Sequence, residues 1–400
     1  MKHGLLTITE SDLLAAEEWL GNQVDVVTTT YSQNLFHDGI DGITWDEANR
    51  LDVMERLFGN SSRQLAIAYE FGGPNRNEYG RAASGEFDAD YRNFAQQLVD
   101  RGMGDSIIRM SHEFNLSWNS KYPSDPQNYA DGFARCVDVM QSVSGANFDF
   151  CFSPARNRLG VAPDAWPVDS AQWPSGEPAP IITPSLYDSE GGTYPDDISG
   201  LSDSELEQLW QDAWVVIPDK IQMWENFGAE RGANRFGTAE WGVATNAYPN
   251  PSGGDNPYFV EKLLDYGISQ GWELQAYWNT ASASGGSHQI HPDSTALTDA
   301  SNMYQSIVSQ QPRTRRPTTR RPIQRTTRVR RLTAATIRHK PGPTTGISRS
   351  TRTSRASKRT SRTSPTGSTT WNRHAHGVTV TTFQEIHLFI LRRCLLNIGA

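Results

Sequence analysis

Two stretches of the sequence each carry a glutamate at the end of a short apolar run. Residues 107–113 read IIRMSHE and residues 236–242 read FGTAEWG, which places Glu113 and Glu240 where buried strands are expected to end. A carboxylate in such surroundings is costly unless it is paired or functional. Each acid alone could be a structural partner of an arginine such as Arg109. Together they predict the two-carboxylate chemistry that cleaves glycosidic bonds.

Strand and helix patterns alternate through residues 1–310. We expect strands at 24–30, 65–69, 107–113, 148–152, 181–187, 236–242 and 274–278, and helices at 11–20, 44–59, 90–101, 125–143, 202–214, 257–266 and 296–308. An eighth strand is expected at the front, either compressed into residues 5–8 or cut off by a late start. The fold class is therefore α/β, a (β/α)8 TIM barrel, in which Glu113 ends the fourth strand and Glu240 the seventh.

The residues around both glutamates form a more specific pattern. Residues 109–118 read RMSHEFNLSW, so that an arginine precedes His112-Glu113 by three positions and Trp118 follows Glu113 by five. Together with residues 239–242 (AEWG), this pattern resembles glycoside hydrolase family 26, retaining (β/α)8 enzymes best known as β-mannanases. The resemblance covers roughly residues 5–309 in strand order, and its two short motifs are specific.

The resemblance implies a role for each matching residue. Glu113 would be the general acid/base and Glu240 the nucleophile. The implied substrate-binding residues are His112 near the cleaved bond, Arg109 beneath the carboxylates, Trp118 on the leaving-group side, Tyr187 beside the nucleophile, Trp278 as the floor of the −1 sugar site, and Trp241. Apolar neighbours such as Phe114 would raise the pKa of the acid.

Departures from the family pattern leave the sugar open. Met110-Ser111 and residues 115–117 (NLS) differ from it, and Asn119-Ser120 replace aromatic residues. Beside β-mannan, we keep β-xylan, mixed-linkage glucan and an exopolysaccharide as substrates. A carbohydrate-binding pseudoenzyme is the non-catalytic alternative. We expect no cofactor and no metal, because His112-Glu113 lacks a second histidine at helical spacing and the three cysteines are scattered.

Charge divides the chain into two regions. Residues 1–310 contain 17 Lys and Arg against 44 Asp and Glu, a net charge of −27, whereas residues 311–400 carry +19. We expect residues 1–310 to be the catalytic domain, adapted to high salt, which screens self-repulsion. Residues 311–400 are Arg/Thr/Ser/Pro-rich and predict a disordered tail. That tail is either a basic arm or an acidic linker read in a shifted frame.

The expected partner is a polysaccharide. We expect no nucleic-acid partner, because the acidic region would repel phosphate, and we expect a monomer. No stretch has the length and hydropathy of a membrane span. A polymeric substrate implies an extracellular location, although residues 1–6 lack the apolar core of a signal peptide.

Overall fold

The chain divides into two units, Met1–Arg316 and Pro317–Ala400. The computed structural model describes residues 1–7, 9–29, 50–156, 178–189, 194–195, 197–215, 221–245, 253–282, 286–291 and 296–311, all of them in the first unit. Apart from Gln311, the expected tail lies outside the described residues.

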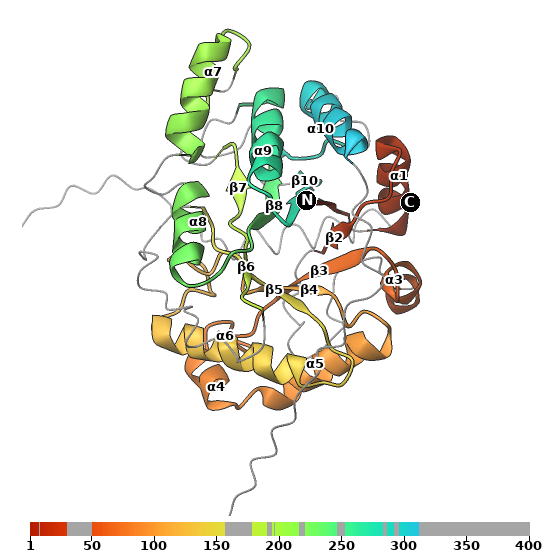
Figure 1. Cartoon of the computed structure of the whole chain (residues 1–400), viewed down its shortest axis with the longest axis vertical. Coiled ribbons are helices and arrows are strands. Elements are labelled where there is room, and N and C mark those ends of the chain that lie inside the picture. The colour runs from red at the N-terminus through yellow and green to blue at the C-terminus, as the bar shows by residue number, and fades with distance from the viewer. Residues whose placement is uncertain are drawn as a thin grey trace, which may run out of the picture. The chain divides into compact units, whose positions relative to one another are not determined.

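A parallel sheet of nine strands forms the centre of the first unit (Figure 1). Its strand order is β6-β5-β4-β3-β2-β1-β9-β8-β7. The strands are β1 (Lys2–Leu6), β2 (Val26–Thr28), β3 (Gln64–Tyr69), β4 (Ile107–Met110), β5 (Asp149–Phe152), β6 (Ile181–Ile182), β7 (Leu186–Tyr187), β8 (Gly237–Gly242) and β9 (Leu274–Tyr277). Parallel neighbours need a crossover connection, usually a helix, which explains the alternating sequence pattern.

The two edges of this sheet belong to one interrupted strand. β6 pairs with β5, and β7 pairs with β8. Single parallel bridges complete both halves, because Ile182 also meets Phe236 before β8, and Ser185 meets Ala155 after β5. Pro184 lies in the gap, where its missing N–H removes a ladder bond. Counted as one strand, β6 and β7 close the sheet into the expected (β/α)8 barrel.

The first strand of the barrel is present as β1, so of the two expected alternatives the one in which it is cut off is wrong; β1 also begins earlier than the expected residues 5–8. β1 pairs with β2 on one side and with β9 on the other. Gly4 lies between Val26 and Ala276, and a Cβ at Gly4 would lie only 2.7 Å from the Val26 oxygen. A glycine and a histidine within five residues hide this strand from pattern analysis, because neither favours a strand by its own propensity.

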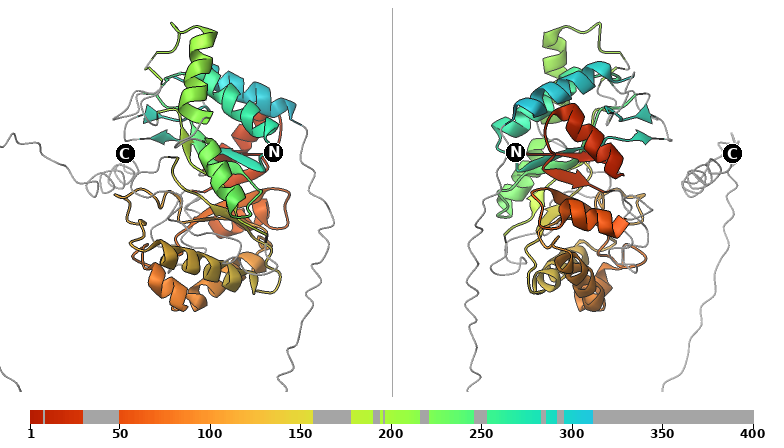
Figure 2. Two further views of the ribbon diagram at one scale, coloured as in Figure 1. Left: turned by 60° about the vertical axis from the view of Figure 1, so that its left-hand side comes forward. Right: turned by 90° about the vertical axis from the view of Figure 1, so that its right-hand side faces the viewer.

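Helices surround the strands on the outside (Figures 1 and 2). They are α1 (Glu10–Leu20), α3 (Arg50–Phe58), α4 (Tyr79–Ser84), α5 (Asp88–Asp100), α6 (Pro126–Gln141), α7 (Asp203–Trp210) with a π-helical turn η4 (Gln211–Val215), α8 (Ile221–Glu230), α9 (Pro257–Ser269) and α10 (Thr298–Gln310). The short helices α4 and α8 were not expected from the sequence. Residues 44–49 of the expected helix 44–59 lie outside the described residues.

The core has two layers. The larger hydrophobic cluster contains the outward-facing side chains of the strands and the helix residues packed on them, such as Ile108, Phe133 and Leu263. The smaller one fills the barrel interior with one residue from each of seven strands: Val26, Ala66, Ile107, Cys151, Ile181, Ala239 and Leu274. Trp210 and Trp214 are buried in the larger cluster. The barrel is therefore a packed scaffold whose site must lie at its rim.

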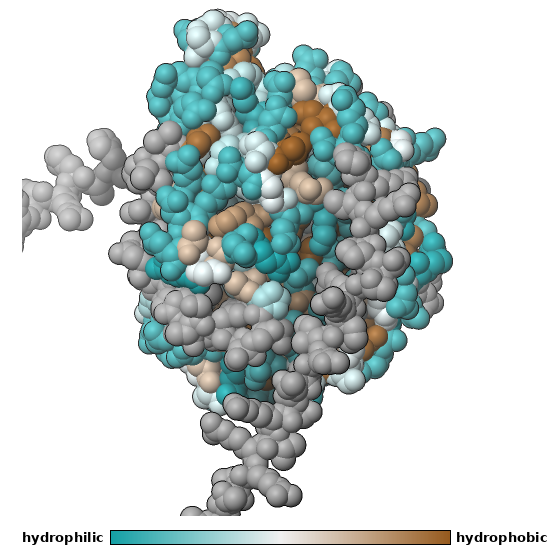
Figure 3. Space-filling model, viewed as in Figure 1, coloured by the Kyte–Doolittle hydropathy of each residue, from teal (hydrophilic) through white to brown (hydrophobic). Residues whose placement is uncertain are grey.

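The described surface is mostly hydrophilic where Figure 3 shows it, with hydrophobic residues in small, separate groups. Among the described residues, no helix combines the length and the apolar character needed to cross a membrane.

Candidate active site

Glu240 lies in β8, the seventh strand of the barrel, and is 7% exposed. Arg109 Nη2 lies 2.6 Å from one of its carboxylate oxygens, and the Tyr187 hydroxyl donates to the other over 2.8 Å. The β8–β9 register shifts between Thr238 and Trp241, an irregularity that can redirect a side chain. A guanidinium and a phenol thus compensate the charge of a buried carboxylate.

Arg109 reaches Glu240 from inside the barrel. It occupies β4 two residues after Ile107, which belongs to the interior cluster, so both side chains leave the strand on the same face. Arg109 is 1% exposed and forms its ion pair across the interior. This contact joins Arg109 to Glu240; the role that the sequence analysis gave Arg109 in the site stays a prediction.

Glu113 lies in a tight turn after β4, and not in the strand as the sequence pattern indicated. β4 ends at Met110, and Ser111 and Glu113 have φ values of 43° and 55°, in the left-handed region. Main-chain bonds hold both: Ser111 N–H donates to the Tyr69 oxygen over 2.8 Å, and Glu113 N–H donates to the Ser153 oxygen over 2.7 Å. Such strained backbone persists where neighbouring strands over-determine it, and it concentrates at functional sites.

The surroundings of Glu113 raise the pKa of its carboxyl group to about 7. Burial is the largest cause, and the negative charge of Glu240 adds to it; Lys121, Ser185 and Arg109 oppose the rise. Glu113 can therefore carry a proton near neutral pH, whereas the carboxyl group of Glu240 is bound by Arg109 and Tyr187. Two acids with divergent environments are the arrangement that general acid and nucleophile require.

His112 is a neutral neighbour of this pair. Burial, reinforced by the cations Lys121, Arg109 and Arg76, holds its pKa well below the ordinary value. Its Nδ1 lies 3.9 Å from a Glu70 oxygen, and the side chain is 17% exposed. A neutral imidazole at the rim can exchange hydrogen bonds with a hydroxyl group.

The three tryptophans expected at the site have different surroundings. Trp118 is 65% exposed, so its indole is available for stacking. Trp278 directly follows β9, is partly exposed, and is bound through its main-chain N–H to the Trp241 oxygen over 2.7 Å. Trp241 is fully buried, and its Nε1 donates to Gln275 over 2.6 Å. The expectation that Trp241 binds substrate is therefore corrected: its ring packs in the core.

Glu70 and Lys121 are two buried charges beside the site that the sequence analysis did not identify as functional. Glu70 directly follows β3 and is 2% exposed, and Lys121 Nζ lies 3.5 Å from its Oε1. Burial raises the pKa of Glu70, against the effect of Lys121 and Arg76. The available signal was an acid at the end of a buried strand, the pattern that also indicates Glu240.

His288 is a further residue that sequence analysis missed. Its ring centroid lies 5.0 Å from that of Tyr187. Nδ1 lies 2.8 Å from the Val243 carbonyl oxygen, which can only accept, so Nδ1 carries the proton and Nε2 the lone pair. Burial lowers the pKa of His288, so the ring is neutral. His288 thus packs on the tyrosine that binds Glu240. Its surroundings, residues 286–291 (GSHQIH), carry no recognisable pattern.

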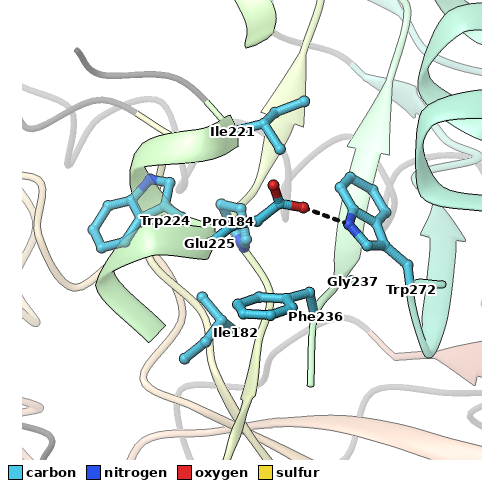
Figure 4. Close-up of a pocket in the computed structure, with 8 residues that line it drawn as sticks. All are labelled: Ile182, Pro184, Ile221, Trp224, Glu225, Phe236, Gly237 and Trp272. Atoms are coloured by element: carbon cyan, nitrogen blue, oxygen red, sulfur yellow. Dashed lines mark hydrogen bonds between the residues drawn. The ribbon is translucent and has the colours of Figure 1, made fainter. Parts of the chain in front are cut away.

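A small crevice between α8 and the outside of the barrel is a separate feature (Figure 4). Its one carboxylate, Glu225, accepts hydrogen bonds from Trp272 Nε1 over 2.9 Å and from the Tyr266 hydroxyl over 2.7 Å. With a single, satisfied acid it lacks the two carboxylates of glycoside hydrolysis. Within the described ranges, no group of three or more His, Cys, Asp or Glu could hold a metal ion.

No family model and no curated protein sequence matches the chain. Similar solved structures include an endo-β-1,4-glucanase of Xanthomonas axonopodis pv. citri, with 13% identity over 77% of this chain and 98% of that one and a TM-score of 0.48. GH26C from a Muricauda species has 14% identity over 76% of this chain and 85% of that one, with a TM-score of 0.45. A Bacillus subtilis mannanase has 13% identity over 70% of this chain and 80% of that one, with a TM-score of 0.40. At such low identity and TM-score the likeness says nothing about the substrate.

Proposed function

We propose that this chain is a retaining endo-β-glycanase that hydrolyses β-1,4-mannan. The observation that carries the proposal is the pairing of Glu240, compensated by Arg109 and Tyr187, with Glu113, whose pKa is raised to about 7. Both lie at the C-terminal rim of a (β/α)8 barrel, where the active sites of this fold occur.

The reaction follows from these two environments. Glu240 attacks the anomeric carbon while Glu113 gives its proton to the leaving glycosidic oxygen. A covalent glycosyl-enzyme forms, and the chain bearing the new hydroxyl leaves. Glu113, now a carboxylate, takes a proton from a water molecule that attacks the same carbon and releases Glu240. Two inversions give net retention of the anomeric configuration.

The remaining rim residues orient the sugar chain. Neutral His112 hydrogen-bonds a hydroxyl group near the cleaved bond. Trp118, with its exposed indole, stacks on a sugar ring on the leaving-group side, and Trp278 forms the floor of the −1 site. Sugar rings present apolar C–H faces that pack well against aromatic rings. The motif around Glu113 favours β-mannan. Because residues 115–117 and 119–120 depart from the family 26 pattern, xylan, mixed-linkage glucan and exopolysaccharide are the substrates to compare with it.

The test is reducing-sugar release by the full chain at high salt on β-mannan, xylan and mixed-linkage glucan. We expect cleavage of mannan, retention of configuration in the first NMR spectra of the product, and a loss of at least about 10³-fold in Glu240→Gln. Glu225→Gln is the matched control, because Glu225 lies in the crevice outside the barrel; it should keep wild-type activity. Cleavage by Glu240→Gln at the wild-type rate, or inversion, contradicts the proposal.

A further inference from the structure

One of the few lysines in the acidic region is buried. Residues 1–310 contain only Lys2, Lys121, Lys220 and Lys262. Lys121 is 4% exposed. Lysine is almost never buried unless it is paired, because removing an ammonium group from water is expensive. The position of Lys121 therefore needs a local reason.

The counter-ion of Lys121 is Glu70, at the end of β3. Their atoms Nζ and Oε1 lie 3.5 Å apart, and both side chains are at least nine-tenths buried. Tyr69 is in register with Met110 in the β3–β4 pair, so Glu70 lies level with Ser111, where the turn to Glu113 begins. His112 Nδ1, within that turn, lies 3.9 Å from the same Glu70 oxygen.

The backbone of Lys121 is tied to that of Glu113. Asn119 joins them, because its Oδ1 accepts from Lys121 N–H over 3.1 Å and its Nδ2 donates to the Glu113 oxygen over 3.4 Å. The buried Tyr79 hydroxyl donates to the Lys121 oxygen over 2.8 Å. The ammonium group is thus held at a fixed place beside the strained turn that presents Glu113.

We propose that Lys121, held by Glu70, is a positioning residue for Glu113 that fixes its turn and supplies a positive charge beside its carboxyl group. The positive charge of Lys121 favours the ionised form of Glu113 and limits the rise of its pKa that burial and Glu240 cause. Because this role presupposes the reaction proposed above, it explains how the acid is kept in a range where it both gives and takes a proton.

Several charged or titratable groups surround Glu113, Glu70 and Lys121. Those around Glu113 are Glu240, Arg109, Tyr187 and Lys121. Those around Glu70 and Lys121 are His112, Arg76 and Tyr129. His112 is neutral, and the pKa of each tyrosine is raised by burial, so Lys121, Arg109 and Arg76 are the cations of this set.

The test compares Lys121→Met with Lys121→Arg in the full chain. Loss of the ammonium group removes a charge that favours ionised Glu113, so the alkaline limb of the kcat/KM profile should move up by roughly one pH unit in Lys121→Met. Lys121→Arg keeps the charge and should keep the limb near its wild-type place. Lys262→Met is the matched control, because Lys262 pairs with Glu207 at the surface; its limb should not move.

A second variant guards against loss of folding. Lys121→Met leaves Glu70 buried without its cation, whereas Glu70→Gln/Lys121→Met removes both charges and avoids an unpaired buried carboxylate. The double variant should show the same upward movement of the limb. The proposal is overturned if the alkaline limb of the kcat/KM profile lies at the wild-type pH in both Lys121→Met and Glu70→Gln/Lys121→Met.

An activity-independent measurement separates this proposal from the proposed function. The ¹³C signal of the Glu113 carboxyl group, assigned by its loss in Glu113→Gln, reports the same pKa without substrate. One outcome is that the wild type cleaves no glycan while the pKa of Glu113 rises in Lys121→Met and in Glu70→Gln/Lys121→Met. In that case the proposed glycanase activity is wrong and the role of Lys121 stands. If glycan is cleaved and neither the limb nor the ¹³C pKa moves, the role of Lys121 alone is wrong.

Discussion

At the scale of single residues, two chemically identical carboxyl groups have been given different properties by their neighbours. Glu240 is bound by a guanidinium and a phenol, which suits a group that must attack as an anion. Glu113 lies near that anion in a partly buried turn, and its pKa rises to about 7. Differences of this kind assign the acid and the nucleophile of a glycosidase.

The raised pKa of Glu113 predicts the alkaline limb of the pH profile. In the proposed reaction the protonated form of Glu113 donates to the leaving oxygen, so kcat/KM on a glycan should fall as pH rises through about 7. A dinitrophenyl glycoside needs no such proton, so its profile should lack this limb. Initial-rate measurements on both substrates check this. A limb near the ordinary glutamate pKa, or the same limb with both substrates, would contradict the assignment of Glu113.

At the scale of elements, strand ends and their irregularities aim the side chains. The end of β4 at Met110 allows the turn that presents Glu113, and the register shift in β8 occurs at Glu240. The break between β6 and β7 places Tyr187 in a segment that pairs with β8, directly beside Glu240. These features depend on close contact between β8 and β9, where Gly237 faces the main chain of Leu274.

Gly237→Ala tests that contact. An added Cβ would overlap the main-chain oxygen of Leu274, so β8 and β9 must separate. We expect a loss of about 1–3 kcal/mol in the free energy of unfolding, measured by denaturant titration. Gly200→Ala is the control, because nothing lies within 4 Å of its added Cβ; its change should stay within about 0.5 kcal/mol. Equal stability of the two variants would show that β8 tolerates the added methyl group.

At the scale of the whole molecule, charge is the dominant feature. Residues 1–310 carry a net charge of −27, and much of it has no nearby cation to offset it, since that region contains only 17 Lys and Arg. Like charges on a compact body repel one another and lower its stability at low ionic strength. At about 1 M salt the screening length falls to roughly 3 Å, which removes most of this repulsion.

The melting temperature should therefore rise by several degrees from dilute buffer to molar NaCl, and activity should rise with it. Thermal unfolding of the full chain followed by circular dichroism measures this. A nonionic osmolyte such as sucrose is the control, because it stabilises by exclusion and does not screen charge. A melting temperature that is highest in dilute buffer would contradict adaptation to salt.

The sequence was sufficient to predict the barrel and the two strands that present Glu113 and Glu240. Alternating strand and helix patterns predicted that Glu113 ends the fourth strand and Glu240 the seventh; in the structure Glu240 lies within the seventh strand, whereas the fourth ends at Met110 and Glu113 lies in the turn that follows. The strand expected at 181–187 is divided around Pro184 into β6 and β7. Such local signals survive because hydrophobic periodicity and proline act over a few neighbouring residues.

Only the tertiary structure decided the burial and pairing of side chains whose neighbours are distant in the sequence. Trp241 lies beside Glu240 in the sequence but points into the core, and Lys121 and Glu70, 51 positions apart in the chain, form a buried pair. His288 adjoins Tyr187 although nothing in its own segment marks it. The sequence by itself determined which strands end in carboxyl groups. Burial and electrostatic pairing, which give those groups their properties, arise only when closure of the barrel brings separate strand ends together.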